Sequence, residues 1–351
     1  MRIALVTDAW ERQVNGVVRT LMTTVSCLRG LGHEVLTVTP SAFRTLPCPT
    51  YPSIRLALFP AAKLGAMLDD YAPDAIHIAT EGPLGHAARR YCLRRRRPFT
   101  SAFHTQFPEY IRLRVPVPVP VPVAFSYAYL RSFHGAAVRT MVPTATQRDK
   151  LTARGFVNLR IWARGVDTRL FNTDEPLSYD YPRPIAIYMG RVAVEKNIEA
   201  FLDLPDIASK IVIGDGPDLA RLAQRYPDCH FLGARYGREL ARHLAGGDVL
   251  VFPSRTDTFG LVLLEALACG LPVAAYPVQG PFDIIEQGVS GVLDEDLGAA
   301  VRGALRLSRA ACVAHARRYS WAAASADFLR YLAPLKAIGD GRAAITGSGT
   351  R

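Results

Sequence analysis

The most informative segment of the sequence is Asp257-Thr-Phe-Gly-Leu-Val-Leu-Leu-Glu265. It follows the apolar run Val249–Phe252, which is typical of a buried strand, and Pro253 interrupts that strand. We expect a helix from about Thr258 to Gly270, since glycine suits the position just past a helix end. A strand, a short loop and a helix in this order predict a ligand site at the carboxyl edge of a parallel sheet.

Three backbone amides and two carboxylates supply the chemistry of this segment. The N–H groups of Thr258, Phe259 and Gly260 stand at the start of the expected helix, where we expect them to hold an anion. Asp257 lies at the mouth of the same crevice. Glu265 lies about two turns further along. Because its neighbours are apolar, we expect this second carboxylate to have binding partners rather than to be a solvated surface group.

The spacing of these acids resembles a motif of the retaining nucleotide-sugar glycosyltransferases of family 4, which have the GT-B fold. That family usually has glutamate where this sequence has Asp257. The resemblance implies that Asp257 and the backbone after it bind hydroxyls of the donor sugar. It also implies that Glu265 accepts hydrogen bonds from ribose hydroxyls, because an ionised carboxylate is an acceptor only.

The N-terminal residues predict a βαβ unit, with strands at 2–7 and 35–39 and a helix from Gly16 to about Arg29. The Gly-x-Gly-x-x-Gly dinucleotide fingerprint is absent. On the residues alone, Gly16 is explained equally well by a turn and by a phosphate that approaches the backbone closely. The run from Asn15 to Val18 resembles the glycine loop of the same family, which implies that Asn15 and Gly16 contact the substrate.

A histidine follows another expected strand, at residues 98–103. His104 therefore stands at the carboxyl end of a strand, where α/β folds place ligands. The run from Phe103 to Tyr110 resembles the active-site histidine segment of the family. The resemblance implies that His104 contacts the donor sugar across the cleft. His77, in contrast, alternates with apolar residues and is expected in the core.

Two cations follow the expected strand Ile185–Met189. Arg191 and Lys196 resemble the Gly-Arg-x-x-x-x-Lys loop that holds the donor diphosphate in the family. Fixed cations at that place stabilise the charge that develops as the nucleoside diphosphate leaves. The resemblance therefore groups Arg191 and Lys196 with His104 and Asp257 as catalytic residues.

A glycine turn follows the next strand of this second half. Gly214-Asp-Gly216 is expected to pass close to the nucleotide, and a plain loop is the alternative.

The resemblance extends from residue 3 to about residue 335 and implies an α/β protein with two facing Rossmann-like domains and a cleft between them. We assign residues 1–171 to an N-terminal, acceptor-side domain and residues 172–318 to a C-terminal domain that binds the nucleotide sugar. A closing helix at 319–340 is expected to cross back to the first domain. The Gly-, Ser- and Thr-rich residues 341–351 are expected to be disordered.

Metals and other cofactors are not expected. The six cysteines show no paired spacing, which argues against a zinc site or a disulfide framework. The resemblance implies a reaction that retains the anomeric configuration without a required metal. Asp294-Glu-Asp296 resembles a metal-binding motif, but it lies far from the other motifs in the sequence. We interpret it as an exposed acidic loop.

The positive charge of the chain is concentrated in its first half. The net charge is +11, and residues 1–170 hold 23 Lys and Arg against 10 Asp and Glu. Such a half suggests an anionic partner, either nucleic acid or a membrane surface. No apolar run reaches the roughly 20 residues of a membrane span, and an acid as early as Asp8 argues against a signal peptide.

Two unusual segments flank the His104 run. Residues 94–97 are four arginines, and residues 115–123 alternate valine and proline. Proline at every second position predicts an extended conformation rather than a helix. Apolar residues beside arginines suit a membrane interface. A solvated helix end and a rigid spacer are the alternatives for the two segments.

The residues together with the family resemblance imply an enzyme, a metal-independent, retaining hexosyltransferase. We expect it to move a hexosyl or hexuronosyl group from a UDP- or GDP-linked sugar to a lipid acceptor such as diacylglycerol, in the cytoplasm and peripherally bound to an anionic inner membrane face. The segments also resemble GDP-mannose-dependent alpha-mannosyltransferases that act on a glycolipid or polysaccharide precursor. A nucleic-acid-binding protein is the remaining alternative, but we expect no nucleic acid because aromatic residues are not interleaved with the arginine run.

Overall fold

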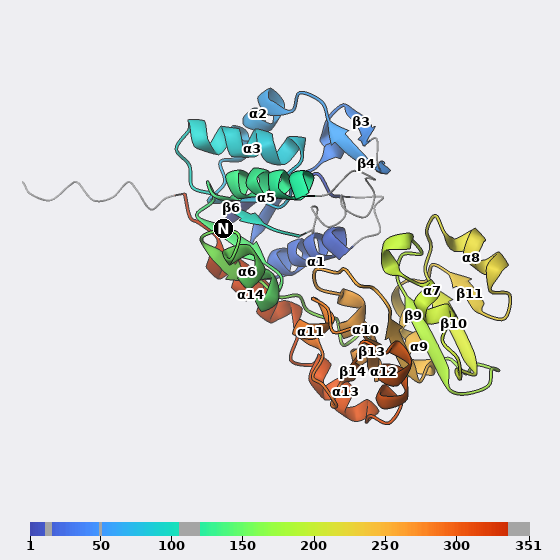
Figure 1. Cartoon of the computed structure of the whole chain (residues 1–351). Helices are drawn as coiled ribbons and strands as arrows, with labels where there is room; N and C mark the ends of the chain where they lie inside the picture. Colours follow the sequence, from blue (N-terminus) through green and yellow to red (C-terminus); the bar gives the residue numbers. More distant parts are fainter. Residues whose placement is uncertain (11–15, 49–50, 105–119, 336–351) are drawn as a thin grey trace, which may run out of the picture.

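The computed structural model describes residues 1–10, 16–48, 51–104 and 120–335 of the chain, with only the backbone described at 51–54 and 120–123. Two α/β units lie next to each other, the N-terminal one in blue to green and the C-terminal one in yellow to orange (Figure 1). Each is built around a parallel sheet of six strands. This is the GT-B architecture expected from the sequence.

The N-terminal sheet has the strand order β2-β1-β5-β6-β7-β8, and every neighbouring pair is parallel. Its strands are β1 (Arg2–Val6), β2 (Glu34–Val38), β5 (Ala75–Ile78), β6 (Thr100–Ala102), β7 (Arg139–Val142) and β8 (Leu159–Ile161). The helices of this half are α1 (Gly16–Gly30), α2 (Ala61–Tyr71), α3 (Pro83–Arg94), α5 (Pro120–His134) and α6 (Ala145–Thr152). A short 3₁₀ helix η1 (Pro40–Ala42) leads into an antiparallel hairpin of β3 (Thr45–Cys48) and β4 (Tyr51–Ala57).

The C-terminal sheet has the strand order β11-β10-β9-β12-β13-β14, again with all neighbouring pairs parallel. Its strands are β9 (Ile185–Met189), β10 (Ser209–Ile213), β11 (His230–Gly233), β12 (Val249–Phe252), β13 (Val273–Ala275) and β14 (Gly291–Leu293). Its helices are η2 (Val194–Lys196), α7 (Glu199–Leu202), α8 (Leu219–Arg225), α9 (Gly237–Gly246), α10 (Leu261–Ala268), α11 (Pro281–Ile284), α12 (Leu297–Ala304) and α13 (Arg309–Ala316).

The order of the strands determines where each sheet can bind a ligand. In the N-terminal sheet β1 lies between β2 and β5, and in the C-terminal sheet β9 lies between β10 and β12. The chain therefore leaves β1 toward one edge of its sheet and β5 toward the other, and β9 and β12 differ in the same way. Such a reversal opens a crevice at the carboxyl ends of the strands. The loops after β1, β5, β9 and β12 border these two crevices.

The last described helix, α14 (Trp321–Tyr331), packs on the N-terminal unit, where Figure 1 shows it in red next to α1. The indole of Trp162 donates to the Ala324 carbonyl at 3.1 Å. Its ring also lies 5.0 Å from that of Phe328. Both rings are fully buried, so apolar burial attaches α14 to the sheet.

Several expected helix ends were wrong. The helix expected from Thr258 begins at Leu261, because Gly260 has φ +82° and breaks the helical conformation. The sequence also predicts a helix from about His86, but α3 begins at Pro83, since proline suits the first helical position. Helix α14 ends at Tyr331, nine residues before the expected end of the closing helix at residue 340.

The valine–proline repeat was expected to exclude a helix, and this was wrong for its last residues. Helix α5 begins at Pro120 and includes residues 120–123. Proline is tolerated in a first turn because the amide that it lacks has no acceptor within the helix there. The rest of the repeat, Asn15 and the tail at 341–351 lie outside the described residues.

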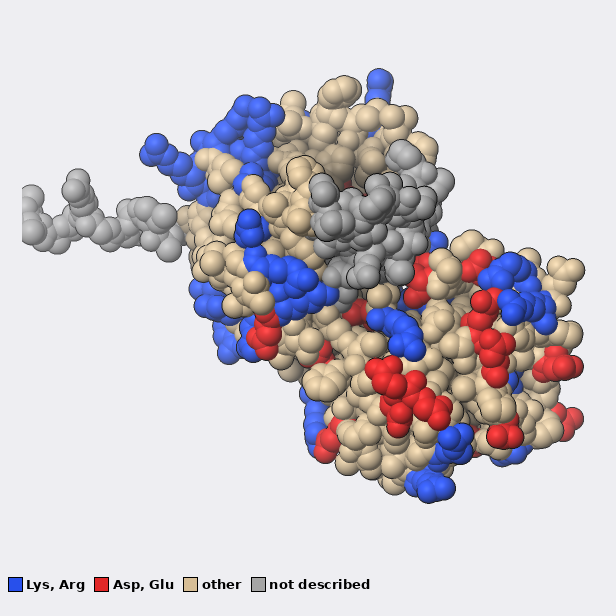
Figure 2. Space-filling view, viewed as in Figure 1, with Lys and Arg blue, Asp and Glu red and all other residues tan. Residues whose placement is uncertain are grey.

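Acidic side chains are unevenly distributed between the two units. Figure 2 shows lysines and arginines over both units, whereas most acidic side chains lie over the C-terminal one. This division agrees with the sequence, in which residues 1–170 carry 23 Lys and Arg and only 10 Asp and Glu. None of the helices in the described part of the chain is long and apolar enough to cross a membrane.

Candidate functional site

Lys196 and Asp257 meet where the loops after β9 and β12 lie next to each other. The ammonium donates to Asp257 Oδ2 at 2.7 Å, and both side chains are mostly buried. Burial raises the pKa of Asp257, but the charge and hydrogen bond of Lys196, with the amides of Phe259 and Thr258, outweigh it and hold that pKa below its usual value. The sequence predicted these two residues in one site, and the structure brings them together.

The amides expected to hold an anion have a different role in this structure. The N–H of Phe259 donates to Asp257 Oδ1 at 3.2 Å. The amides of Phe259 and Thr258 therefore hold the carboxylate of Asp257, and Gly260 supplies the sharp bend before α10. Asp257 is thus fixed from both sides, by an ammonium and by its own loop.

Glu265 lies in the middle of α10 and is only 4% exposed. Its Oε1 accepts a hydrogen bond from Arg19 of α1, which also forms an ion pair with it. Burial raises the pKa of Glu265, and the arginine opposes this rise. Its other oxygen, Oε2, is buried and has no hydrogen-bond partner within the described residues. An acceptor in this state favours a ligand that brings a hydroxyl.

The N-termini of two helices lie close to each other next to this pair. Gly16 is the first residue of α1, and a Cβ built on it would lie 3.7 Å from Leu261, the first residue of α10. A helix N-terminus carries partial positive charge and free amides, so two of them favour an anion. The 3.7 Å gap is an ordinary van der Waals distance, so space in this structure does not require glycine at Gly16.

His104 follows β6 at the carboxyl edge of the N-terminal sheet and is 7% exposed. Its Nδ1 accepts from Arg164 Nη2 at 3.3 Å, and Trp162 packs edge-on at 5.8 Å. Burial, followed by the charge of Arg164, lowers the pKa of His104 well below its ordinary value. His104 is therefore a neutral hydrogen-bonding group at neutral pH.

Arg191 follows β9 and the turn at Gly214 follows β10, and these two loops of the C-terminal unit lie against each other. Arg191 is exposed, and its carbonyl accepts from Tyr188 Oη at 2.7 Å. A Cβ on Gly214 would meet the Gly190 carbonyl at 1.8 Å, and one on Gly216 would meet the Val192 carbonyl at 2.2 Å. These glycines are required by close packing against the Arg191 loop, which is a structural reason that the sequence could not reveal.

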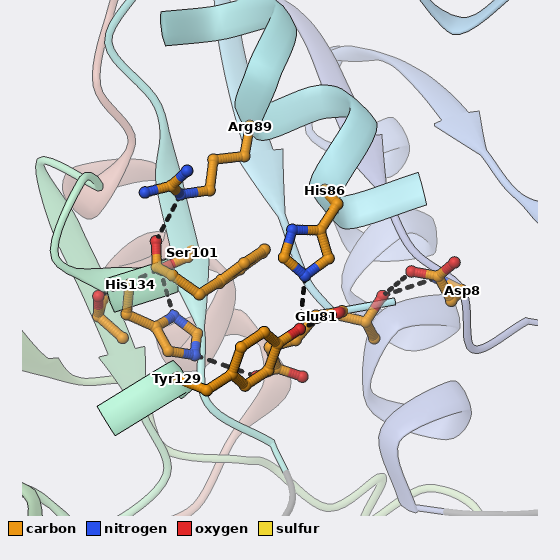
Figure 3. A network of polar contacts seen from close by, with 10 residues as sticks. Asp8, Glu81, His86, Arg89, Ser101, Tyr129 and His134 are labelled. Atoms are coloured by element: carbon orange, nitrogen blue, oxygen red, sulfur yellow. Dashed lines mark hydrogen bonds and ion pairs between the residues drawn. The ribbon is translucent and has the colours of Figure 1, made fainter. Parts of the chain in front are cut away.

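A polar network borders the crevice of the N-terminal sheet (Figure 3). Asp8, after β1, accepts from the Leu84 amide at 2.9 Å and from the Thr80 hydroxyl at 2.9 Å. Burial raises the pKa of Asp8, and these hydrogen bonds oppose the rise. Glu81 is bonded to His134 Nε2 at 3.0 Å. The acids at this edge thus fix the start of α3 and connect it to α5.

The sequence reasoning missed several contacts between the two units. Gln279 donates to Gln147 at 2.5 Å and Asp283 accepts from the Thr146 amide at 3.0 Å. The loop before α11 and α11 itself therefore contact α6 of the other unit.

The acidic loop Asp294–Asp296 is exposed, as expected. Asp296 caps α12 by accepting from the Gly298 amide at 2.9 Å.

Comparison with known proteins gives matches over both units. The family described as "Glycosyltransferase Family 4" matches residues 14–170, and "Glycosyl transferases group 1" matches residues 183–309. A GDP-mannose-dependent alpha-mannosyltransferase of Mycobacterium tuberculosis is 30% identical over 322 residues, which cover 84% of this chain and 83% of that protein.

The comparison also gives a relative named for a lipid product and, separately, a similar crystal structure. An alpha-monoglucosyldiacylglycerol synthase of Streptococcus pneumoniae is 26% identical over 346 residues, 87% of this chain and 78% of that protein. The crystal structure of Anabaena HepE in complex with UDP and glucose has a TM-score of 0.67 at 16% identity and covers 94% of this chain and 98% of that one.

Proposed function

Because this chain belongs to glycosyltransferase family 4 and is a glycosyltransferase with the GT-B fold, we propose that it transfers a hexosyl or hexuronosyl group from a UDP- or GDP-linked sugar to a lipid acceptor such as diacylglycerol. The observation that carries this proposal is the half-paired carboxylate of Glu265 next to the neighbouring N-termini of α1 and α10. These groups suit the two parts of a nucleoside diphosphate.

The ribose is the proposed partner of Glu265. Oε1 is held by Arg19, and Oε2 is buried with no described partner. A ribose hydroxyl that donates to Oε2 would satisfy this acceptor, and leaving it unsatisfied costs about 1–3 kcal/mol. We also propose that Gly16, at the N-terminus of α1, and the Gly214–Gly216 turn contact the nucleotide sugar.

The diphosphate is the proposed partner of Arg191 and Lys196. Phosphate oxygens next to Lys196 would share its ammonium with Asp257, and the α1 and α10 N-termini would add partial positive charge. Such charges, fixed before the reaction, act where negative charge develops as the diphosphate leaves. A divalent cation would stabilise the same negative charge on the leaving diphosphate. Because Arg191, Lys196 and the helix N-termini can do this, we extend the proposal to a reaction that needs no metal.

The sugar is proposed to lie between Asp257 and His104. Asp257 is held ionised and can accept from sugar hydroxyls, whereas His104 is neutral. Retention at the anomeric carbon is part of the proposal. It rests on the sequence resemblance and not on a contact in the structure.

A lipid acceptor is supported by the name of the Streptococcus pneumoniae relative and by the basic N-terminal half. We place the enzyme at the cytoplasmic face of an anionic membrane, where each nearby cation contributes about 1 kcal/mol. Helix α5 adds an exposed aromatic side chain, Phe125, which is 74% exposed. The same helix contains Arg131, and aromatic residues near an arginine suit a membrane interface.

A second candidate is a GDP-mannose-dependent alpha-mannosyltransferase that acts on a glycolipid or polysaccharide precursor. The 30% identity to the Mycobacterium tuberculosis protein, which extends over 84% of this chain, favours it. The two candidates share the proposed site. They differ in the acceptor, and the second restricts the donor to GDP-mannose.

One experiment tests the proposal and separates the candidates. The purified protein is incubated with a panel of UDP- and GDP-sugars and with either diacylglycerol vesicles or a glycolipid or polysaccharide precursor, and the products are identified by mass spectrometry. Glycosylated diacylglycerol supports the first candidate, and mannose transferred from GDP-mannose to the glycolipid or polysaccharide precursor supports the second. EDTA should leave turnover unchanged. Turnover of no donor on any lipid, with a soluble acceptor glycosylated instead, would overturn the lipid assignment.

A further inference from the structure

Arg164 is a buried cation next to the candidate active site. It follows β8 and is 4% exposed. Its Nη1 donates to the carbonyls of Trp162 at 2.6 Å and Ala163 at 3.3 Å, and its guanidinium lies 4.2 Å from the centre of the Trp162 ring. Burial lowers the pKa of Arg164 to about 9, which leaves it charged at neutral pH. Within the described residues it forms no ion pair with a carboxylate.

Burying a charge without an opposite charge is costly, so such a residue calls for a reason other than stability. Its second terminal nitrogen, Nη2, contacts the imidazole of His104, with 3.3 Å between Nη2 and Nδ1. A guanidinium has only N–H donors, so Nδ1 must be the acceptor. A neutral imidazole with its lone pair on Nδ1 carries its hydrogen on Nε2.

The other groups around His104 agree with a neutral ring. His77 of β5 and His134 of α5 lie near enough to oppose a positive charge on it, and Trp162 packs against its edge. Nε2 is buried and has no hydrogen-bond partner within the described residues. A buried N–H without an acceptor is unfavourable, so this position favours a ligand oxygen.

We propose that Arg164 is the positioning residue for His104: its hydrogen bond to Nδ1 fixes the tautomer with the proton on Nε2, so that His104 donates a hydrogen bond to an oxygen of the bound donor sugar. The identity of that oxygen rests on the proposed function. The fixed tautomer rests on the geometry alone and is present without substrate.

The direct test is the tautomer of His104 in the substrate-free protein. The whole chain is labelled with ¹⁵N in its histidine rings, and long-range ¹H–¹⁵N correlation spectra identify the protonated nitrogen. The His104 signals are assigned by their loss in His104→Gln. We expect Nε2 to carry the proton from pH 8 to pH 6, with no titration in that range. Arg164→Met should give a mixture of tautomers and a ring that titrates, whereas Arg164→Lys should keep part of the preference.

Kinetics give a second readout. Arg164→Met should lower turnover roughly 10- to 100-fold, the scale seen when the partner that orients a functional imidazole is removed. The loss should grow as the pH falls and His104 becomes protonated. Affinity for the nucleoside diphosphate alone should not change, because that ligand does not reach the sugar position. Arg160→Met, at an exposed arginine of β8, is the matched control and should behave as the parent protein.

The outcomes separate this proposal from the proposed function. A proton on Nδ1 in the parent protein, or an unchanged tautomer and titration in Arg164→Met, would overturn it. A chain with the expected tautomer that transfers no sugar would leave the positioning role in place and refute the proposed function. A variant that does not fold is recognised by lost nucleoside diphosphate affinity, and Arg164→Lys then supplies the tautomer measurement.

Discussion

Arg19 of α1 and Glu265 of α10 form an ion pair that joins the two units of the molecule, although 246 residues separate them in the sequence. The pair leaves Glu265 Oε2 buried and without a described partner. Glu265 therefore has one oxygen held by the N-terminal unit and the other available to a ligand. Nucleotide binding at this carboxylate is expected to depend on both halves of the chain.

Glu265→Ala should lose nucleotide affinity more than stability. The substitution removes the proposed ribose acceptor, and a hydrogen bond to a charged group contributes about 1.5–3 kcal/mol, or roughly 10- to 100-fold in affinity. Titration calorimetry with UDP and GDP measures the effect. Affinity for both nucleotides equal to that of the parent would contradict the ribose role.

Arg19→Met is the companion variant. It keeps the carboxylate but removes its charge partner, so we expect a smaller loss of affinity and a further rise in the pKa of Glu265, since burial then acts unopposed. The affinity of this variant for UDP and GDP should fall because the carboxylate of Glu265 is then buried without an opposite charge. Equal affinity in Arg19→Met and the parent would show that the ion pair is not coupled to the nucleotide.

Arg191→Ala and Lys196→Ala should each lower turnover by roughly 10²–10³, the scale for losing one group that stabilises transition-state charge. Steady-state transfer assays at saturating donor measure this. Arg255→Ala serves as a control, because Arg255 is an exposed cation of the loop after β12 that lies over Tyr276 and pairs with Glu295. Near-normal turnover in both Arg191→Ala and Lys196→Ala would remove the support for the diphosphate assignment.

The fold and the site differ in how far the sequence could predict them. Strands such as Ile185–Met189 were identified to the residue, because a run that is buried on both faces is continuously apolar. Asp257 and Lys196 were predicted in one site because both match motifs of the family that the sequence resembles, and each also follows a strand, where α/β folds place ligands. Helix ends were less certain, since the conformation of Gly260 decides where α10 begins.

What the sequence could not show are contacts between distant residues. Nothing in the residues near Arg19 or Arg164 indicates a partner, because Glu265 and His104 are brought to them by tertiary packing. An arginine in a sequence is most often a solvated surface group, and only its burial in the fold distinguishes Arg164 from its neighbour Arg160.

Lys196→Met should destabilise the protein in a way that depends on pH. The pKa of Asp257 is lower in the folded protein than its ordinary value, so its ionised form contributes stability above about pH 4, and this is lost as the pH falls through the lower folded value. Without Lys196, burial should raise that pKa and leave a buried carboxylate without its counter-charge. The expected loss is about 3 kcal/mol at pH 7 and less at pH 5.

Urea unfolding at the two pH values measures this difference. The double variant Lys196→Met with Asp257→Asn is the control, because it has no buried charge and should recover much of the stability at pH 7. A loss of the same size at pH 7 and pH 5 would mean that Lys196 stabilises the loop through packing rather than through the charge of Asp257.

Binding to membranes should depend on salt and on lipid charge. Residues 1–170 hold 23 Lys and Arg against 10 Asp and Glu, and each cation near an anionic surface contributes about 1 kcal/mol, which salt screens. We expect co-sedimentation with anionic liposomes at low salt, weaker binding at high salt, and little binding to zwitterionic liposomes. A parent protein that ignores anionic liposomes at low salt would favour a soluble acceptor.

The arginine run at residues 94–97 allows the electrostatic part to be tested at defined positions. Arg95 pairs with Asp69 at 2.7 Å and Arg97 donates to Tyr91 at 3.0 Å, so two of the four arginines also have partners within the protein. Changing all four to serine should reduce liposome binding and lipid glycosylation, but donor hydrolysis, which needs no membrane, should continue. Changing only Arg94 and Arg96 spares those partners. If that pair of changes leaves binding intact while the fourfold change abolishes it, the run acts through the fold of α3, and the membrane contact must lie elsewhere on the N-terminal unit.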